Sequence, residues 1–287
     1  MTLPIIIFHI GNQEYVRLCL QQALKAGNKN VILISDNENY FNDLPVTVVN
    51  YNKYSNNLKK FTPLYKHFST NSAQLELICI IRWMCIHEYM KEHNIPRAFI
   101  CDSDVFIYEN LDTIDKEYLH SYNFMLCSSS SKNVTGGQSI WNFDKLNKFI
   151  KFVFDFYNNE NLKKIYNWWN NYKEEGGICD MTLLYYFTHN ETEFTGLRLP
   201  DYPHFSQDLT QIFNNEFTFD LHLATYGNHL YPDDYEINKT NNNKNIKFID
   251  GKPYCFCKHL NKNIRFVLLH FQGRNKSLMN SWYNKTN

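Results

Sequence analysis

The chain has 287 residues, 44% of them hydrophobic and 16% aromatic, which is enough for a large core and excludes an intrinsically disordered protein. Lysine plus arginine and aspartate plus glutamate each total 29, so the net charge is zero and no basic excess indicates a nucleic-acid partner. No stretch reaches the roughly 18 apolar residues of a membrane-spanning helix, and the N-terminus lacks the features of a signal peptide. The eight cysteines mostly lie in apolar runs, which suits reduced thiols, so we expect a soluble, cytoplasmic protein.

The first hundred residues alternate between strand and helix patterns. Short apolar runs predict strands at residues 4–10, 31–34, 46–49 and 97–101. The continuous run at 4–10 is typical of a parallel strand that is covered on both faces. Residues 13–26 and 75–92 have helical periodicity, the second with one apolar face. This alternation predicts an α/β fold with a doubly wound, mostly parallel, Rossmann-like sheet.

After residue 108 the alternation is lost. We expect strands at 122–127 and 138–142, helices at 144–157 and 181–187, and mostly loops with short strands from 202 to 251. Runs of asparagine and lysine, such as residues 241–244, are interpreted as compositional bias. No repeat or flexible linker interrupts the chain, so we expect a single domain over residues 1–287.

Two aspartates provide the strongest sign of chemistry. Asp102 and Asp104, separated by Ser103, come directly after the strand predicted at 97–101. Ligands of open α/β sheets bind beyond the carboxyl ends of the strands, and carboxylates are suitable ligands for Mg²⁺ or Mn²⁺. Such an ion can neutralise the charge that develops on a diphosphate leaving group. The pattern alone leaves an ordinary polar turn as the alternative.

A second motif lies near the C-terminus, where His270, Gly273 and Lys276 follow an apolar run. An imidazole can complete a metal site that has two carboxylates, a glycine lets the backbone approach phosphate oxygens, and a lysine supplies positive charge. For His270 the alternative is a histidine at the end of a core strand that finds its partners locally.

Together these motifs resemble those of GT-A glycosyltransferases, the second being similar to the His-x-x-Gly-x-x-Lys segment of glycogenin-like and bacterial galactosyltransferases. The resemblance implies a GT-A fold in which Asp102, Asp104 and His270 bind Mn²⁺ or Mg²⁺. It also implies that Gly273 and Lys276 hold the diphosphate of a UDP-sugar donor. The chain departs from the pattern after the lysine, where Ser-Leu replaces the common Pro-Trp.

Further positions are expected to contact the donor. They are the strand-end turn of Ile10, Gly11 and Asn12, Asp36 at the next strand end, Arg82 on the helix before the metal motif, Ser103 within it, and Gly137 in a glycine-rich segment that resembles the wall of the donor-sugar site. Alternatives stay open for these positions: an ordinary turn at 10–12, a local cap for Asp36, a solvated face for Arg82 and a hairpin turn at Gly137.

The candidate catalytic residue is Asp180. It matches an acidic residue that, in many GT-A enzymes, precedes a helix and contacts the acceptor or the sugar. Its alternative role is that of a helix N-cap, because it stands directly before a helical pattern. If Asp180 is structural, the remaining candidates are Glu174, Glu175 and Asp220. Cys255, Cys257 and His259 offer too few ligands at the spacing of a zinc site and are expected to be a packed segment.

The resemblance implies transfer of a hexosyl or N-acetylhexosaminyl group from a UDP-sugar to an acceptor hydroxyl of a glycan or glycoconjugate, with retention favoured. Residues 1–108 would be the nucleotide-sugar-binding half, and residues 109–287 the acceptor-binding half with the C-terminal metal and diphosphate motif. The alternatives are a phosphohydrolase of the haloacid dehalogenase type with Asp102 as nucleophile, and a non-catalytic glycan-binding relative. The phosphohydrolase family places its aspartate on the first strand, whereas here it lies about a hundred residues in. A sugar-nucleotide pyrophosphorylase would need a glycine-rich basic loop after Ile10, which is missing.

Overall fold

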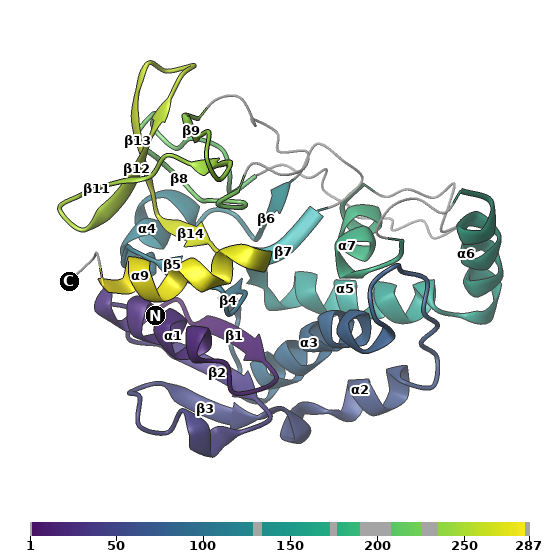
Figure 1. The fold of residues 1–287 in the computed structure, drawn as a ribbon. Coiled ribbons are helices and arrows are strands. Elements are labelled where there is room, and N and C mark those ends of the chain that lie inside the picture. Colours follow the sequence, from purple (N-terminus) through teal and green to yellow (C-terminus); the bar gives the residue numbers. More distant parts are fainter. Residues whose placement is uncertain (1, 129–133, 173–176, 190–207, 225–234, 285–287) are drawn as a thin grey trace.

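The computed structural model describes residues 2–128, 134–172, 177–189, 208–224 and 235–284. Its central sheet has six strands in the spatial order β3 (Thr47–Asn50), β2 (Val31–Ser35), β1 (Ile5–His9), β4 (Arg97–Cys101), β7 (Val134–Asn142) and β6 (Phe124–Ser128) (Figure 1). The first four strands are parallel, β7 runs antiparallel to β4, and β6 runs antiparallel to β7. The predicted α/β fold with a mostly parallel sheet is confirmed.

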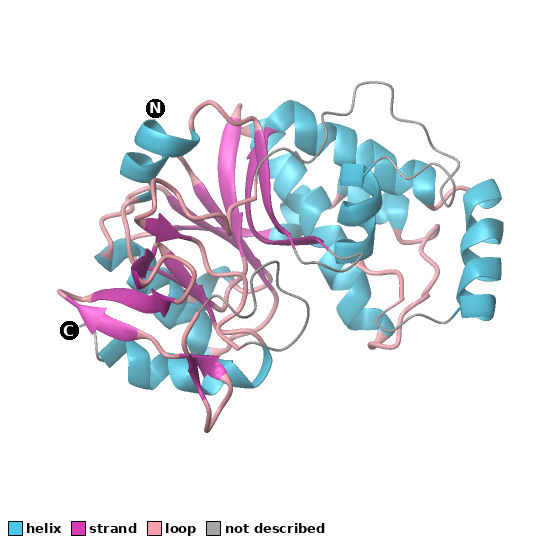
Figure 2. Cartoon of the chain, turned by 90° about the horizontal axis from the view of Figure 1, so that it is seen from above, coloured by secondary structure: helices cyan, strands magenta, loops and turns pink. Residues whose placement is uncertain are grey.

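Both faces of the sheet are buried, as the continuous apolar run of β1 predicts. Along β1, Ile5 and Ile7 pack into one hydrophobic cluster and Ile6 and Phe8 into the other. Helix α1 (Glu14–Lys25) lies on the first face, and α3 (Ala73–Glu92), α5 (Phe143–Phe156) and α7 (Asp180–His189) lie on the second. Seen from above, helices lie on both sides of the strands (Figure 2).

Helix α3 is buried on more sides than its sequence indicated. It begins after Ser72, whose hydroxyl accepts the N–H of Leu75 at 3.3 Å as an N-cap. Between residues 80 and 87 every side chain except Arg82 is buried, so the prediction of a single apolar face is wrong. The reason is tertiary packing, because α2 (Asn56–Phe61), α5 and α7 all contact this helix in addition to the sheet.

The C-terminal part adds a second, smaller sheet in the order β11 (Lys247–Ile249), β12 (Lys252–Cys257), β13 (Lys262–Phe266) and β8 (Phe217–Thr218). Cys255 and Cys257 alternate with partly exposed residues of β12 and are fully buried in the first cluster, where Cys255 Sγ donates to the Glu236 carbonyl at 3.3 Å. These cysteines are part of the core, and all eight cysteines of the chain lie in described residues as free thiols.

A short strand pair joins the residues after β4 to the C-terminal segment. Strand β5 (Val105–Ile107) runs antiparallel to β14 (Leu268–His270), with Val105 opposite His270. The remaining elements are α4 (Leu111–Ile114), α6 (Asn159–Tyr172), β9 (Ile237–Asn238), β10 (Asn243–Lys244), α9 (Met279–Tyr283) and the helical turns η1 (Glu38–Tyr40), η2 (Tyr51–Tyr54), η3 (Asp115–Leu119) and η4 (Gly273–Leu278). Among the described helices, none has the length and apolar character needed to cross a bilayer.

Candidate active site

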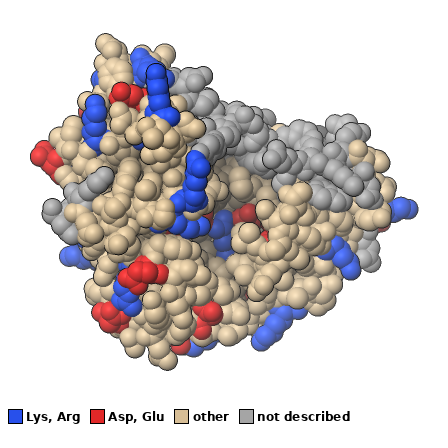
Figure 3. Space-filling model, viewed as in Figure 1, with Lys and Arg blue, Asp and Glu red and all other residues tan. Residues whose placement is uncertain are grey.

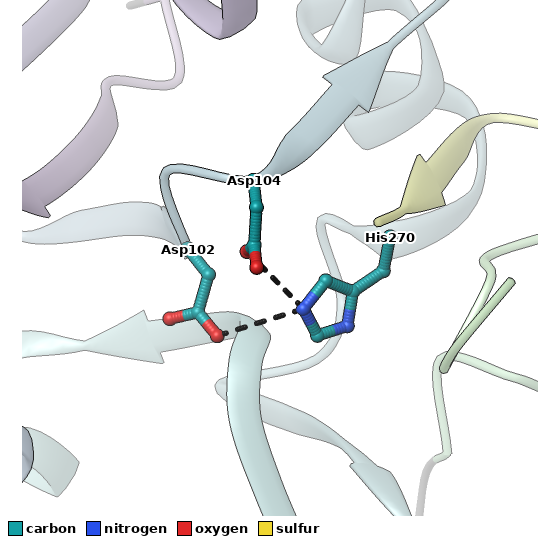
Figure 4. A group of neighbouring side chains, drawn as sticks. All are labelled: Asp102, Asp104 and His270. Carbon is teal, nitrogen blue, oxygen red and sulfur yellow. Dashed lines mark ion pairs between the residues drawn. The ribbon is translucent and has the colours of Figure 1, made fainter. Parts of the chain in front are cut away.

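Three side chains meet where β4 ends and β5 begins. Asp102 follows β4, and its N–H donates to the Gly137 carbonyl of β7 at 2.7 Å. Asp104 directly precedes β5, and because β5 pairs with β14, His270 lies beside it. Figure 4 shows both carboxylates and the imidazole ring of His270 turned toward a common point.

The distances within this group suit a single ion. Nε2 of His270 lies 3.3 Å from Asp104 Oδ1 and 3.9 Å from Asp102 Oδ2. Asp102, Asp104 and His270 each offer one potential ligand atom, and these atoms all lie within 4.8 Å of one another. Asp104 and His270 are buried, whereas Asp102 is partly exposed to solvent. Within the described ranges no other group of three His, Cys, Asp or Glu side chains meets in this way.

The hydrogen bonds of His270 test whether the group fits a cation. Its Nδ1 lies 2.8 Å from the Leu221 carbonyl oxygen, which can only accept, so Nδ1 carries a hydrogen. Its Nε2 is buried, has no hydrogen-bond partner and faces two carboxylates. In the neutral ring this nitrogen presents a lone pair toward negative charge, an arrangement that a divalent cation between the three groups would stabilise. The donor set therefore fits a Mn²⁺ or Mg²⁺ ion.

Neighbouring charges shift the pKa values within this group. Burial lowers the pKa of His270, but the carboxylates of Asp104 and Asp102 outweigh it and raise that pKa to about 9. Burial raises the pKa of Asp104, whereas His270 and Lys276 together hold it well below its ordinary value. The Lys276 Nζ lies 3.0 Å from Asp104 Oδ2. A proton and a cation therefore compete for Nε2 of His270.

Arg82 connects the Asp102–Asp104–His270 group to the candidate catalytic residue, Asp180. One terminal nitrogen of its guanidinium donates to Asp102 Oδ1, and the other donates to Asp180 Oδ2 at 2.7 Å. The Trp83 indole N–H reaches the same Asp180 oxygen at 3.3 Å. Burial lowers the pKa of Arg82, but the two carboxylates outweigh it and raise the pKa. The alternative of a solvated Arg82 is excluded, because its side chain is 16% exposed and doubly ion-paired.

Gly137 lies in the middle of β7, so the alternative of a hairpin turn at this position is wrong. A Cβ atom at Gly137 would overlap the Asp102 carboxylate, and one at Gly136 would overlap the ring of Trp83. These glycines thus allow β7 to lie directly against the site. A side chain at residue 137 would displace Asp102 from its place beside His270.

The fold was compared with known proteins. No protein-family model matches the sequence, and no curated protein does. The crystal structure of mouse xyloside xylosyltransferase 1 in its apo form is similar with a TM-score of 0.52 and 11% identity, over 79% of this chain and 89% of that chain. The chain has the GT-A glycosyltransferase fold. At this identity the GT-A likeness shows the fold, and the reaction has to be argued from the site.

Two other solved structures are also similar. A glycosyltransferase involved in the glycosylation of the major capsid of PBCV-1 matches with a TM-score of 0.44 and 12% identity, over 98% of this chain and 100% of that chain. The galactosyltransferase LgtC, solved in complex with donor and acceptor sugar analogues, matches with a TM-score of 0.37 and 12% identity, over 63% of this chain and 69% of that chain. The GT-A assignment rests on the xylosyltransferase.

The positions predicted to bind the nucleotide lie at the next strand ends of the GT-A sheet. The N–H of Gly11, whose φ is +112°, donates to Asp36 Oδ1 at 2.8 Å, which joins the ends of β1 and β2. Asn12 accepts from Asn37 at 3.3 Å, and Ile10 packs partly buried against the second hydrophobic cluster. The turn and Asp36 are thus one structural unit on the carboxyl edge of the sheet, the edge at which Asp102 and Asp104 also lie.

His9 is a site residue that the sequence interpretation missed. This last residue of β1 is buried, and its Nδ1 lies 2.9 Å from the Ser103 hydroxyl, between the two aspartates. Its Nε2 lies 2.5 Å from Gln13 Oε1. A polar residue at the end of the apolar run 4–10 was the available signal. His9 links the turn at 10–12 to the aspartate pair.

Gly273 and Lys276 lie on the segment that follows β14. Gly273 has a φ of +62°, a left-handed conformation that glycine adopts without strain, and it begins η4. The turn directs Lys276 back to Asp104.

In the space-filling view, the face of the molecule that is seen in Figure 1 is hollowed near its middle, and acidic and basic side chains lie inside the hollow (Figure 3). The same part of Figure 1 contains the ends of β7 and β14 and helix α7.

Proposed function

We propose that the chain transfers a hexosyl or N-acetylhexosaminyl group from a UDP-sugar to a hydroxyl of a glycan or glycoconjugate. The observation that carries the proposal is the convergence of Asp102, Asp104 and the buried Nε2 of His270, which faces both carboxylates, at the carboxyl edge of a GT-A sheet. These three residues would hold Mn²⁺ or Mg²⁺. When bound, such an ion neutralises the charge that develops on the diphosphate leaving group.

The surrounding residues have separate tasks in this proposal. Lys276 and the backbone at Gly273 bind the diphosphate, and Lys276 exchanges its contact with Asp104 for the phosphate oxygens. Ser103, Asp36 and the turn at residues 10–12 bind the nucleotide. Gly137 and Arg82 lie against the donor sugar in this proposal, since both lie directly beside the Asp102 carboxylate. In this proposal residues 1–108 form the nucleotide-sugar-binding half, and residues 109–287 bind the acceptor and contribute the C-terminal metal and diphosphate motif.

Asp180 is the proposed catalytic carboxylate. Its ion pair with Arg82 places it one side chain away from the metal ligand Asp102. Its charge there can orient the acceptor or stabilise the reacting sugar. We propose retention of anomeric configuration, on the strength of the His270–Lys276 motif. The eight free thiols support action in a reducing compartment such as the cytoplasm.

A donor screen tests the proposal. UDP-hexoses, UDP-N-acetylhexosamines and UDP-xylose (included because the similar mouse enzyme is a xylosyltransferase) are incubated with the protein in Mn²⁺ or in EDTA, and UDP release is measured. We expect Mn²⁺-dependent release from one donor class. Release of inorganic phosphate from phosphomonoesters would instead support the phosphohydrolase reading. Binding of UDP-sugar without turnover, in the presence of glycan acceptors, would indicate a non-catalytic relative.

Lys276→Ala should weaken UDP and the UDP-sugar together, since the lysine is proposed to bind the diphosphate that both contain. Loss of one charge-assisted contact corresponds to about 10- to 100-fold in affinity. Calorimetric titrations of both ligands in Mn²⁺ measure it, with Lys262→Ala, an exposed lysine of β13, as the control. Unchanged affinity for both ligands would remove Lys276 from the site.

A further inference from the structure

The two-residue strand β10 (Asn243–Lys244) lies outside the motifs but directs both of its side chains inward. It pairs antiparallel with β9 (Ile237–Asn238) and forms a bridge to Ala224 through Asn243. Asn243 is 4% exposed, and the side chain of Lys244 is 9% exposed. Burial of an ammonium group is costly unless it is paired. The partners of Lys244 therefore show which part of the structure β10 stabilises.

Lys244 forms hydrogen bonds to residues 220–222, the segment that in turn contacts His270. Its Nζ donates to Asp220 Oδ1 at 2.8 Å and to the His222 carbonyl at 2.5 Å. The other oxygen of Asp220 accepts the backbone N–H of His270 at 3.0 Å. Between them, the Leu221 carbonyl accepts the ring Nδ1–H at 2.8 Å. One ammonium group therefore fixes both ends of residues 220–222, which contact His270 at its backbone and at its ring.

This arrangement decides which nitrogen of His270 faces the aspartates. The Leu221 carbonyl keeps the hydrogen on Nδ1 and leaves Nε2 toward Asp102 and Asp104. Such outer partners of a metal-binding histidine set its tautomer and ring orientation. The side chain of Asp220 is 0% exposed, so without Lys244 a carboxylate would be buried unpaired and the segment would have to rearrange.

Asn243, the neighbouring residue, holds the other half of the C-terminal motif. Its amide donates to Asn275 Oδ1 at 3.1 Å, and the Asn275 amide donates back to Asn243 Oδ1 at 3.3 Å. Asn243 is 4% and Asn275 5% exposed, so water does not replace these bonds easily. Asn275 directly precedes Lys276 on η4. The amide pair thus fixes the turn from which Lys276 reaches the site.

We propose that Asn243 and Lys244 are positioning residues for the two ligands of the site. Lys244 acts through Asp220 on His270 and thereby on the metal ion, and Asn243 acts through Asn275 on Lys276 and thereby on the diphosphate. The inference rests on the proposed function, because it assigns the residues that align the same site. It predicts that adjacent substitutions in one short strand affect two different ligands.

One titration series separates the two effects. UDP binding is measured by calorimetry at a range of Mn²⁺ concentrations, which gives the Mn²⁺ concentration for half-maximal binding and the dissociation constant of UDP at saturating Mn²⁺. Lys244→Met should raise the half-maximal Mn²⁺ concentration by about 10- to 100-fold and leave UDP affinity at saturating Mn²⁺ within about threefold. Asn275→Ala should weaken UDP at saturating Mn²⁺ by about 3- to 10-fold and leave the Mn²⁺ midpoint nearly unchanged.

Further variants keep the test valid if one substitution prevents folding. Asp220→Asn removes the charge between Lys244 and His270 and should shift the Mn²⁺ midpoint in the same direction as Lys244→Met. Asn243→Ala should repeat the effect of Asn275→Ala, and the double variant should be no worse than either single one, because one amide pair is lost in each case. Asp115→Asn is the matched control, since it breaks the partly buried Arg97–Asp115 pair at the opposite end of β4.

The outcomes distinguish this inference from the proposed function. If the unmodified protein binds UDP without any dependence on Mn²⁺, the proposed metal site itself fails. If its binding does depend on Mn²⁺ but Lys244→Met and Asp220→Asn match the Asp115→Asn control at the Mn²⁺ midpoint, Lys244 has only a structural role. Equal shifts of both constants in all variants would mean that β10 stabilises the region as a whole and positions neither ligand.

Discussion

Asp104→Ala should abolish Mn²⁺-dependent transfer, with a fall in initial rate of at least about 10³-fold. The Lewis-acid contribution of a metal is several kcal/mol, and each 1.36 kcal/mol corresponds to roughly a factor of ten in rate. Asp104 is buried and its carboxylate faces Nε2 of His270, and among the described residues no further His, Cys, Asp or Glu side chain joins this group. Rates of UDP release with the best donor, in excess Mn²⁺, measure the effect.

The fold should survive this substitution. The backbone carbonyl of Asp104 accepts the N–H of Phe271 at 2.8 Å, and the β5–β14 pairing does not depend on the carboxylate. Some stability of the metal-free protein will be lost, on the order of 1–3 kcal/mol, because the carboxylate also pairs with His270 and Lys276. Thermal unfolding monitors this loss, and Asp43→Ala, at an exposed ion pair with Arg17, is the control. Near-normal transfer by Asp104→Ala in EDTA would disprove the metal assignment.

The central sheet and the aspartate pair could be predicted because their signals are local. Four apolar runs of strand length gave β1 to β4, and the residues after such a run face the ligand edge of an open sheet. The burial of α3 on several sides could not be predicted in this way. The apolar pattern of α3 depends on its own residues alone. The helices that cover its outer side come from other parts of the chain, residues 56–61 and 143–156.

Contacts between distant segments are what the sequence could not supply. The resemblance to GT-A enzymes predicted that His270 joins the two aspartates, but not the contact that brings it there. His270 lies beside Asp104 because the three-residue strands β5 and β14 pair, and strands this short carry no sequence pattern that identifies their partner. Lys244 and Asn243 lie in a run of asparagine and lysine that was interpreted as compositional bias. Their role depends on burial beside Asp220 and Asn275, which only the three-dimensional arrangement provides.

Asp180→Asn should reduce transfer by about 10²-fold or more, the size of a general-base or comparable carboxylate contribution. The contacts of Asp180 Oδ2 support this expectation. Helix α7 begins at Asp180 itself, and Oδ2 of Asp180 accepts from Arg82 and Trp83. Asparagine keeps an oxygen acceptor for both donors but loses the negative charge opposite Arg82.

The variant should remain folded with a modest loss of stability, because Arg82 keeps its second carboxylate, Asp102. Asp144→Asn is the matched control, since it removes an exposed carboxylate from the first turn of α5 and so measures the effect of charge at a helix N-terminus alone. Transfer by Asp180→Asn at the parental rate would leave Asp180 a structural residue. The catalytic carboxylate would then have to be Glu174 or Glu175, which lie outside the described residues, because both oxygens of Asp220 are already held by Lys244 and the His270 N–H.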